Sequence, residues 1–152
     1  MNKAFQIFFI LCISLVSVAQ NQQRTDSLMS ALSNTPDLKD QVTILLELTT
    51  QLKYNRPDEA LSFVEQALVK SALKEQKLQA YVQMADIHYS GTRYQKAMDY
   101  AVKAIDLAGE TGNTAYLAEA HRILGRIYMD IGEYGASSDH VYHSLKLFEQ
   151  IH

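Results

Sequence analysis

Three small residues with fixed spacing occur twice in this chain, and the two sets lie 40 residues apart. They are Ala85, Ala97 and Ala104 in the first copy and Gly125, Ser137 and Ser144 in the second. Two antiparallel helices approach closely only where side chains are short, while larger residues fill the grooves on either side. Repetition at this period therefore predicts stacked helical hairpins whose small residues mark the points of contact.

A weaker third copy follows the same spacing at Leu48, Ala60 and Ala67. A large residue replaces the first small one here, and the match depends on the segment from Pro57 to Leu61. No segment alternates apolar and polar residues with the period of two that a half-buried β-strand shows. The sequence therefore predicts an all-α protein, an α-α superhelix of stacked antiparallel helix hairpins.

The two clear copies resemble the tetratricopeptide repeat (TPR). This helix-turn-helix unit has a small residue at its eighth position, an aromatic residue near the eleventh, and alanine-like residues at the twentieth and twenty-seventh. Agreement covers residues 78–108 and 118–148. The period of 40 residues exceeds the usual 34 and resembles a long-linker variant found in exported bacterial signalling proteins. The resemblance implies a TPR-like solenoid with a degenerate repeat 1 at 41–77, repeat 2 at 78–117 and repeat 3 at 118–152.

The first 19 residues are typical of a signal peptide. Lys3 precedes an apolar stretch from Ala4 to Val18, and small residues at Ser17 and Ala19 suit a signal peptidase. We expect this segment to direct export to a periplasmic or other extracytoplasmic compartment and to be cleaved after Ala19. The apolar stretch is short for a membrane span, which needs about 20 residues, so a retained anchor is the less favoured alternative. The single cysteine lies inside this stretch, so no lipid attachment or disulfide is expected.

The remaining chain divides into helices separated by turn signals. Residues 20–40 should contain a polar linker at 20–23 and a capping helix at 25–33. Thr35 is the expected N-cap of the next helix, because Pro36 would occupy its first position. Gly132 is expected to end a later helix in a left-handed conformation. The helices expected after the cap are residues 36–53, 57–72, 76–89, 93–109, 114–131 and 134–150.

The sequence lacks the signatures of common catalytic and cofactor sites. There is no phosphate-binding glycine loop, no cysteine pair and no His-Glu-x-x-His motif, so neither an enzyme, a cofactor nor a metal site is expected. A formal net charge of −3 argues against nucleic-acid binding. His140 and His143 lie three residues apart, but on the expected solvent face with no third ligand nearby. His88 takes an aromatic packing position, and the competing interpretation is a titrating switch.

The TPR resemblance implies a binding surface, because the first helix of each hairpin lines a concave groove in that family. The lysine and asparagine positions that some members use to hold terminal carboxylates carry other residues here, so the ligand preference must differ. The positions implied to line the groove are Thr49, Lys53, Gln79, Gln83, Asp86, Tyr89, Glu119, Arg122, Arg126, Met129 and Asp130.

Two features of this implied groove bear on its ligand. Arg122 and Arg126 are one helical turn apart, which suits a carboxylate or an acidic peptide; the equal alternative is pairing with acids on their own helix. Tyr89 is the best aromatic anchor for a peptide. By contrast, Tyr94, Tyr128 and Tyr134 occupy packing positions of the repeat and are expected in the core with a polar tip.

The last hairpin is expected to leave apolar residues uncovered. Leu145, Leu147, Phe148 and Ile151 have no following repeat in this sequence, so either a longer natural chain or another molecule would cover them. We expect an exported, non-enzymatic module that binds a protein or peptide, as the sensory front of a histidine kinase or DNA-binding regulator. A missing C-terminal part would then supply any membrane anchor. The alternative is a structural scaffold that self-associates through its open end.

Overall fold

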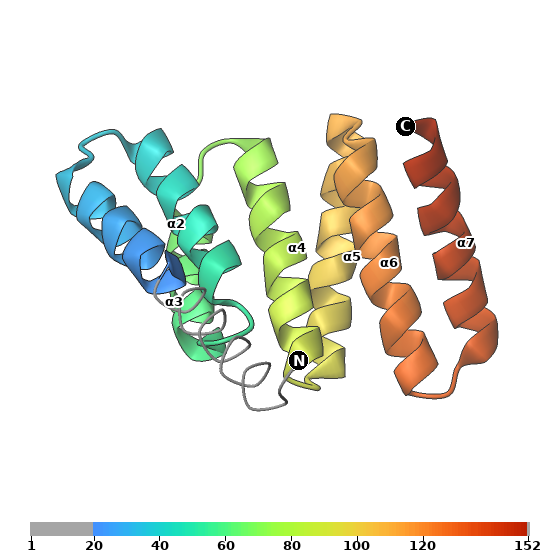
Figure 1. The fold of residues 1–152 in the computed structure, drawn as a ribbon. Coiled ribbons are helices and arrows are strands. Elements are labelled where there is room, and N and C mark those ends of the chain that lie inside the picture. Colours follow the sequence, from blue (N-terminus) through green and yellow to red (C-terminus); the bar gives the residue numbers. More distant parts are fainter. Residues whose placement is uncertain (1–19, 152) are drawn as a thin grey trace, which may run out of the picture.

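The computed structural model describes residues 20–151, so the expected signal peptide lies outside the described residues. Residues 20–34 form a leading helical segment, and no strand occurs in the described part of the chain. The helices that follow are α2 (Leu38–Leu52), α3 (Pro57–Lys70), α4 (Lys74–Ser90), α5 (Tyr94–Thr111), α6 (Thr114–Asp130) and α7 (Tyr134–Gln150). Figure 1 shows them standing side by side along the molecule. The predicted all-α class is confirmed.

The helices pack as three consecutive hairpins, α2 with α3, α4 with α5, and α6 with α7. Successive hairpins join through contacts of α3 with α4 and of α5 with α6. In addition, α4 contacts both α2 and α6, whereas α3, α5 and α7 make no contact with one another. The first helices are therefore closer together than the second helices, so the stack curves toward them. We call the surface formed by α2, α4 and α6 the inner face.

The small residues of the repeat lie where the hairpins close, as predicted. Ala85, Ala97 and Ala104 are completely buried. At Gly125, an added Cβ would lie only 2.8 Å from Cγ2 of Val141 on the facing helix. Ser137 fills the next contact and donates a hydrogen bond from its Oγ to the Gly125 carbonyl at 2.8 Å. The spacing of small residues thus placed the register of the hairpins correctly.

The start of the chain departs from the sequence prediction in two details. Residues 20–23 are helical and not a linker. The N-cap of α2 is Asp37, whose carboxylate accepts a hydrogen bond from the Asp40 backbone N–H, and not Thr35. Thr35 instead donates its hydroxyl to the Ala31 carbonyl at 2.7 Å and so closes the preceding helix.

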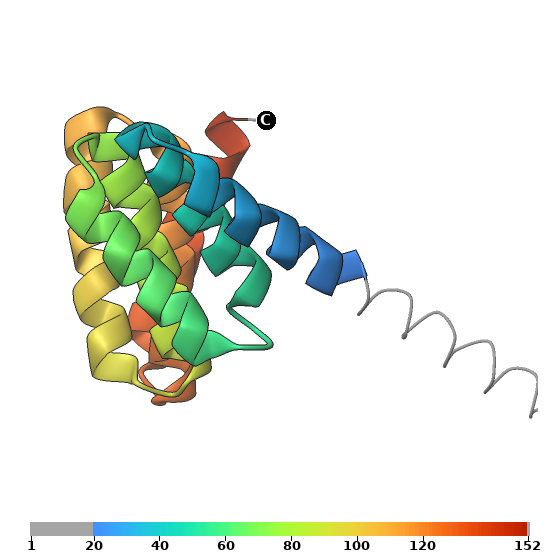
Figure 2. The ribbon, with the colours of Figure 1, turned by 90° about the vertical axis from the view of Figure 1, so that its left-hand side faces the viewer.

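The leading segment packs against the first hairpin. Leu32 packs against the apolar cluster of α2, α3 and α4. Arg24 pairs with Glu47 of α2 at 2.6 Å. Figure 2 shows the segment running obliquely away from the stacked hairpins toward the start of the chain.

One sequence prediction for the last hairpin, the burial of Tyr134, is wrong. Tyr94 and Tyr128 are partly buried against the core, but Tyr134 is 72% exposed. The hydroxyl of Tyr94 lies 3.4 Å from Asp130 of the next hairpin. The described residues include no helix beyond α7 to give Tyr134 the equivalent contact.

Within residues 20–151, no helix combines the length and apolar character of a membrane span.

Candidate peptide-binding face

Asp86 of α4 is the centre of the inner face. Its side chain is only 5% exposed, yet it carries a carboxylate, so it needs partners. Lys53 lies just after α2 and donates to Asp86 Oδ2 at 2.6 Å. The hydroxyl of Tyr54 donates to the same oxygen at 3.3 Å. Burial by itself lowers the pKa of Lys53, but the hydrogen bond and the charge of Asp86 outweigh it, so the pKa is raised.

Arg126 reaches the same carboxylate from α6 but does not close a hydrogen bond with it. Its Nη1 atom is 3.9 Å from Asp86 Oδ1, and its side chain is 43% exposed. The guanidinium carbon lies over the ring of Tyr89, 4.2 Å from the centroid. Such stacking holds the guanidinium plane in place and leaves its edge free to donate. Asp86 of α4 therefore gathers groups from the turn after α2 and from α6, so that all three hairpins contribute.

Arg122 differs from Arg126 in its pairing. Its Nε atom donates to Glu119 on the same helix at 2.8 Å, and its Nη2 atom donates to the other carboxylate oxygen. This hydrogen bonding raises the pKa of Arg122 further. The alternative of pairing within the helix thus holds for Arg122. Arg126 instead reaches across to α4. Asp130 accepts hydrogen bonds from Tyr89 at 2.8 Å and from Tyr94.

Besides Asp86, two of the residues implied to line the groove are not accessible. Thr49 is completely buried, and its hydroxyl donates to the Leu45 carbonyl of its own helix at 2.8 Å. Gln83 is 8% exposed because its amide nitrogen donates to the Leu46 carbonyl and to Thr50 of α2. Gln83 thus links α4 to α2, whereas Thr49 bonds within α2, and neither side chain is available to a ligand. Gln79, in the first half of α4, is half-buried.

The accessible residues of the inner face form a smaller set than the sequence implied. Met129 and Asp130 are exposed at the end of α6. Tyr54 was missed, although it is 69% exposed and bound to Asp86, because it lies in the turn after α2 and not on a repeat position. An aromatic residue directly after Lys53 was the only available signal. The residues that a ligand can reach are Lys53, Tyr54, Gln79, Tyr89, Glu119, Arg122, Arg126, Met129 and Asp130.

The histidines have two different surroundings. His88 is 6% exposed and stacks on Tyr100 with ring centroids 5.6 Å apart, so the packing interpretation is confirmed. His140 was expected to face solvent, but it is half-buried and stacks on Tyr128. His121 of α6 lies beside it, where no third imidazole was expected. No group of three or more His, Cys, Asp or Glu side chains in residues 20–151 is arranged to hold a metal ion.

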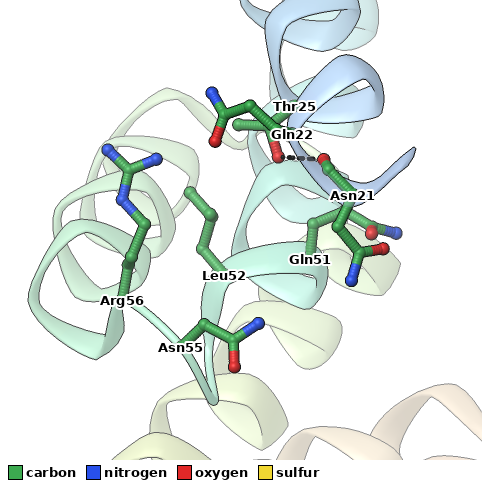
Figure 3. Close-up of a pocket in the computed structure, with 7 residues that line it drawn as sticks. All are labelled: Asn21, Gln22, Thr25, Gln51, Leu52, Asn55 and Arg56. Carbon is green, nitrogen blue, oxygen red and sulfur yellow. Dashed lines mark hydrogen bonds between the residues drawn. The ribbon is translucent and has the colours of Figure 1, made fainter. Parts of the chain in front are cut away.

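A cavity of about 270 Å³ lies between the leading segment and the turn after α2. Figure 3 shows its polar lining. Its buried hydroxyl group, on Thr25, is already used, since it donates to the Asn21 carbonyl at 2.9 Å. Arg56 is likewise paired with Glu59 at 2.7 Å. The remaining lining residues are Gln22, Gln51, Leu52 and Asn55. The Thr25 hydroxyl and the Arg56 guanidinium therefore already have partners within the chain.

Comparison with known proteins supports the fold only. No family model matches the sequence, and no curated protein matches it. The structure is similar to that of BtubC (BKLC) from P. vanneervenii, with a TM-score of 0.66 and 15% sequence identity. The aligned region covers 88% of this chain and 56% of that chain, so this chain spans little more than half of its length.

Proposed function

We propose that this chain is a TPR-like interaction module that binds a protein or peptide on its inner face. The observation that carries the proposal is the convergence of Lys53, Asp86 and Arg126, one from each hairpin, beside the ring of Tyr89. A surface built from three hairpins is extended along the stack, which suits an extended ligand. Aromatic and arginine side chains of this kind are the common anchors of protein interfaces.

The proposed ligand is a segment that carries a carboxylate. The buried carboxylate of Asp86 balances the charges of Lys53 and Arg126 but cannot be reached by a ligand. The guanidinium of Arg126, by contrast, is partly exposed. Arg126 lacks a carboxylate oxygen at hydrogen-bond distance, so an acidic side chain of a ligand would complete its pairing. Asp130 limits this preference, because it is also exposed on the same face. We therefore propose a ligand with one or two acidic residues and not a long acidic run.

Selection from a library of short random peptides tests this proposal. The 152-residue chain should enrich peptides with acidic residues, and Arg126→Gln should reduce their affinity by about tenfold or more. Arg122→Gln is the matched control, because Arg122 is already paired with Glu119, and it should change affinity less than about threefold. Enrichment without acidic residues would reject the ligand class alone. The absence of any enrichment would reject peptide binding.

We further propose that the module is exported and forms the sensory part of a larger signal-transduction protein, a histidine kinase or a DNA-binding regulator. The apolar stretch from Ala4 to Val18, followed by small residues, supports export. Mass spectrometry of the extracytoplasmic fraction should find Gln20 at the N-terminus. Reading the gene beyond the codon for His152 would test the signalling role, which requires an output domain there.

The second candidate is a scaffold that self-associates through the last hairpin. Exposed apolar side chains on α7 favour it, among them Val141 at 45%, Tyr142 at 54% and Leu145 at 55% exposure. A scaffold would keep its self-association when Arg126 is replaced, whereas a peptide-binding module would lose its ligand. The two functions are therefore separable with one variant.

A further inference from the structure

The contact between α6 and α7 includes two histidines that face each other. Nδ1 of His121 lies 2.9 Å from Nδ1 of His140. His140 also stacks on Tyr128 with ring centroids 5.3 Å apart, and His143 lies against His121 at 5.5 Å. Both members of the close pair are half-buried, while His143 is exposed. Nothing in the inner face requires this cluster, since none of these rings is among its accessible residues.

The state of protonation decides whether this contact exists. An imidazole nitrogen donates a hydrogen bond only when it carries a proton and accepts one only when it does not. The two Nδ1 atoms can therefore bond only when a single proton lies between them. A pair that holds two such protons brings two donors and two positive charges together, and the contact becomes repulsive.

We propose that His121 and His140 form a proton-sensitive latch, which joins α7 to α6 near neutral pH and releases it in acid. The groups that act on the two rings come from α7: His143 adds a second like charge when it is protonated, and Asp139 opposes it. Neither α4 nor α5, which also pack on α6, contributes a charged group among those that shift the pKa of either ring. Release would uncover the apolar side of α7 that packs at Gly125.

The direction of the pH effect follows from the surroundings of the pair. Burial lowers the pKa of His121, and the charges of His140 and His143 lower it further. Burial and His143 also lower the pKa of His140, although Asp139 raises it in part. The closed hairpin thus binds fewer protons than the open one below the ordinary histidine pKa of 6.5. The equilibrium constant for opening of the hairpin should therefore increase as the pH falls. If the open form binds one extra proton, the increase is up to about tenfold per pH unit.

Amide hydrogen exchange on the 152-residue chain measures this opening directly. After correction for intrinsic exchange, α7 amides should lose protection as the pH falls from about 7.5 to about 5.5, and α2 amides should lose much less. His140→Gln should remove this difference between the helices. His143→Gln, which leaves the close pair intact, should keep most of it. An α7 that loses protection equally in wild type and His140→Gln would overturn the latch.

A second measurement does not depend on any variant. NMR of histidine nitrogens in the wild-type chain reports which ring nitrogen carries a proton. Near pH 7.5, the Nδ1 atom of one ring of the pair should carry a proton and that of the other should not. If both Nδ1 atoms are found without protons, the bond between the rings does not exist and the latch is rejected.

Discussion

Thr92 holds a backbone conformation that threonine rarely adopts, with φ at 57°. The following hairpin has Gly132 at the same place, with φ at 85°, and the two turns close with matching backbone hydrogen bonds. The turn therefore requires a left-handed residue, and a β-branched side chain is strained there. The strain at Thr92 is local and should be removable.

Replacing Thr92 with glycine is thus expected to raise the free energy of unfolding by about 1 kcal/mol. The reciprocal change, Gly132→Ala, should lower it by about the same amount, because the required conformation is then imposed on a residue with a Cβ. Urea denaturation of both variants measures the two shifts. A loss of stability in Thr92→Gly would mean that the threonine side chain contributes more than its strain costs.

Between helices, a larger side chain at a tight contact should lower the free energy of unfolding, whereas the same change at an exposed position should have little effect. Ala97→Leu and Gly125→Leu should each cost about 1 to 3 kcal/mol, since Ala97 is fully buried and Gly125 already leaves no room for a Cβ. Gln95→Leu, on the exposed side of α5, should cost less than about 0.5 kcal/mol. Thermal unfolding of the three variants should give these two classes. Equal losses would show that the register is wrong.

The hairpins and their contact points were predictable because the residues buried at the contacts are small, and small residues recur in the sequence at a fixed spacing. The cross-helix pairings were not. Whether Arg126 pairs with Asp130 or reaches Asp86 depends on the distance between α4 and α6, which no local pattern contains. The His121–His140 contact similarly depends on the rotation of α7 about its axis. Thr49 was misplaced because a small polar residue can satisfy its hydroxyl within its own helix.

Within residues 20–151, the two ends of the helical stack differ. The leading segment covers the first hairpin through Leu32 and the Arg24–Glu47 pair. At the other end, Tyr134, Tyr142 and Leu145 of α7 are more than half exposed. A helical stack buries its core between neighbouring units, so a unit with one free side keeps apolar surface in water. This surface and the inner face are therefore separate candidates for interaction.

Self-association through α7 is the expected outcome at high concentration for the mature chain, residues 20–152. Leu145→Glu should shift the equilibrium to monomer, because it places a charge in the exposed apolar stripe. Val69→Glu is the matched control: Val69 is 88% exposed on α3, far from that stripe, and the change should leave the mass unaltered. A polar capping helix added after His152 should also give monomer and raise the thermal midpoint, since it buries the same surface. Light scattering over a concentration series decides the matter, and a wild type that remains monomeric throughout would refute association through α7.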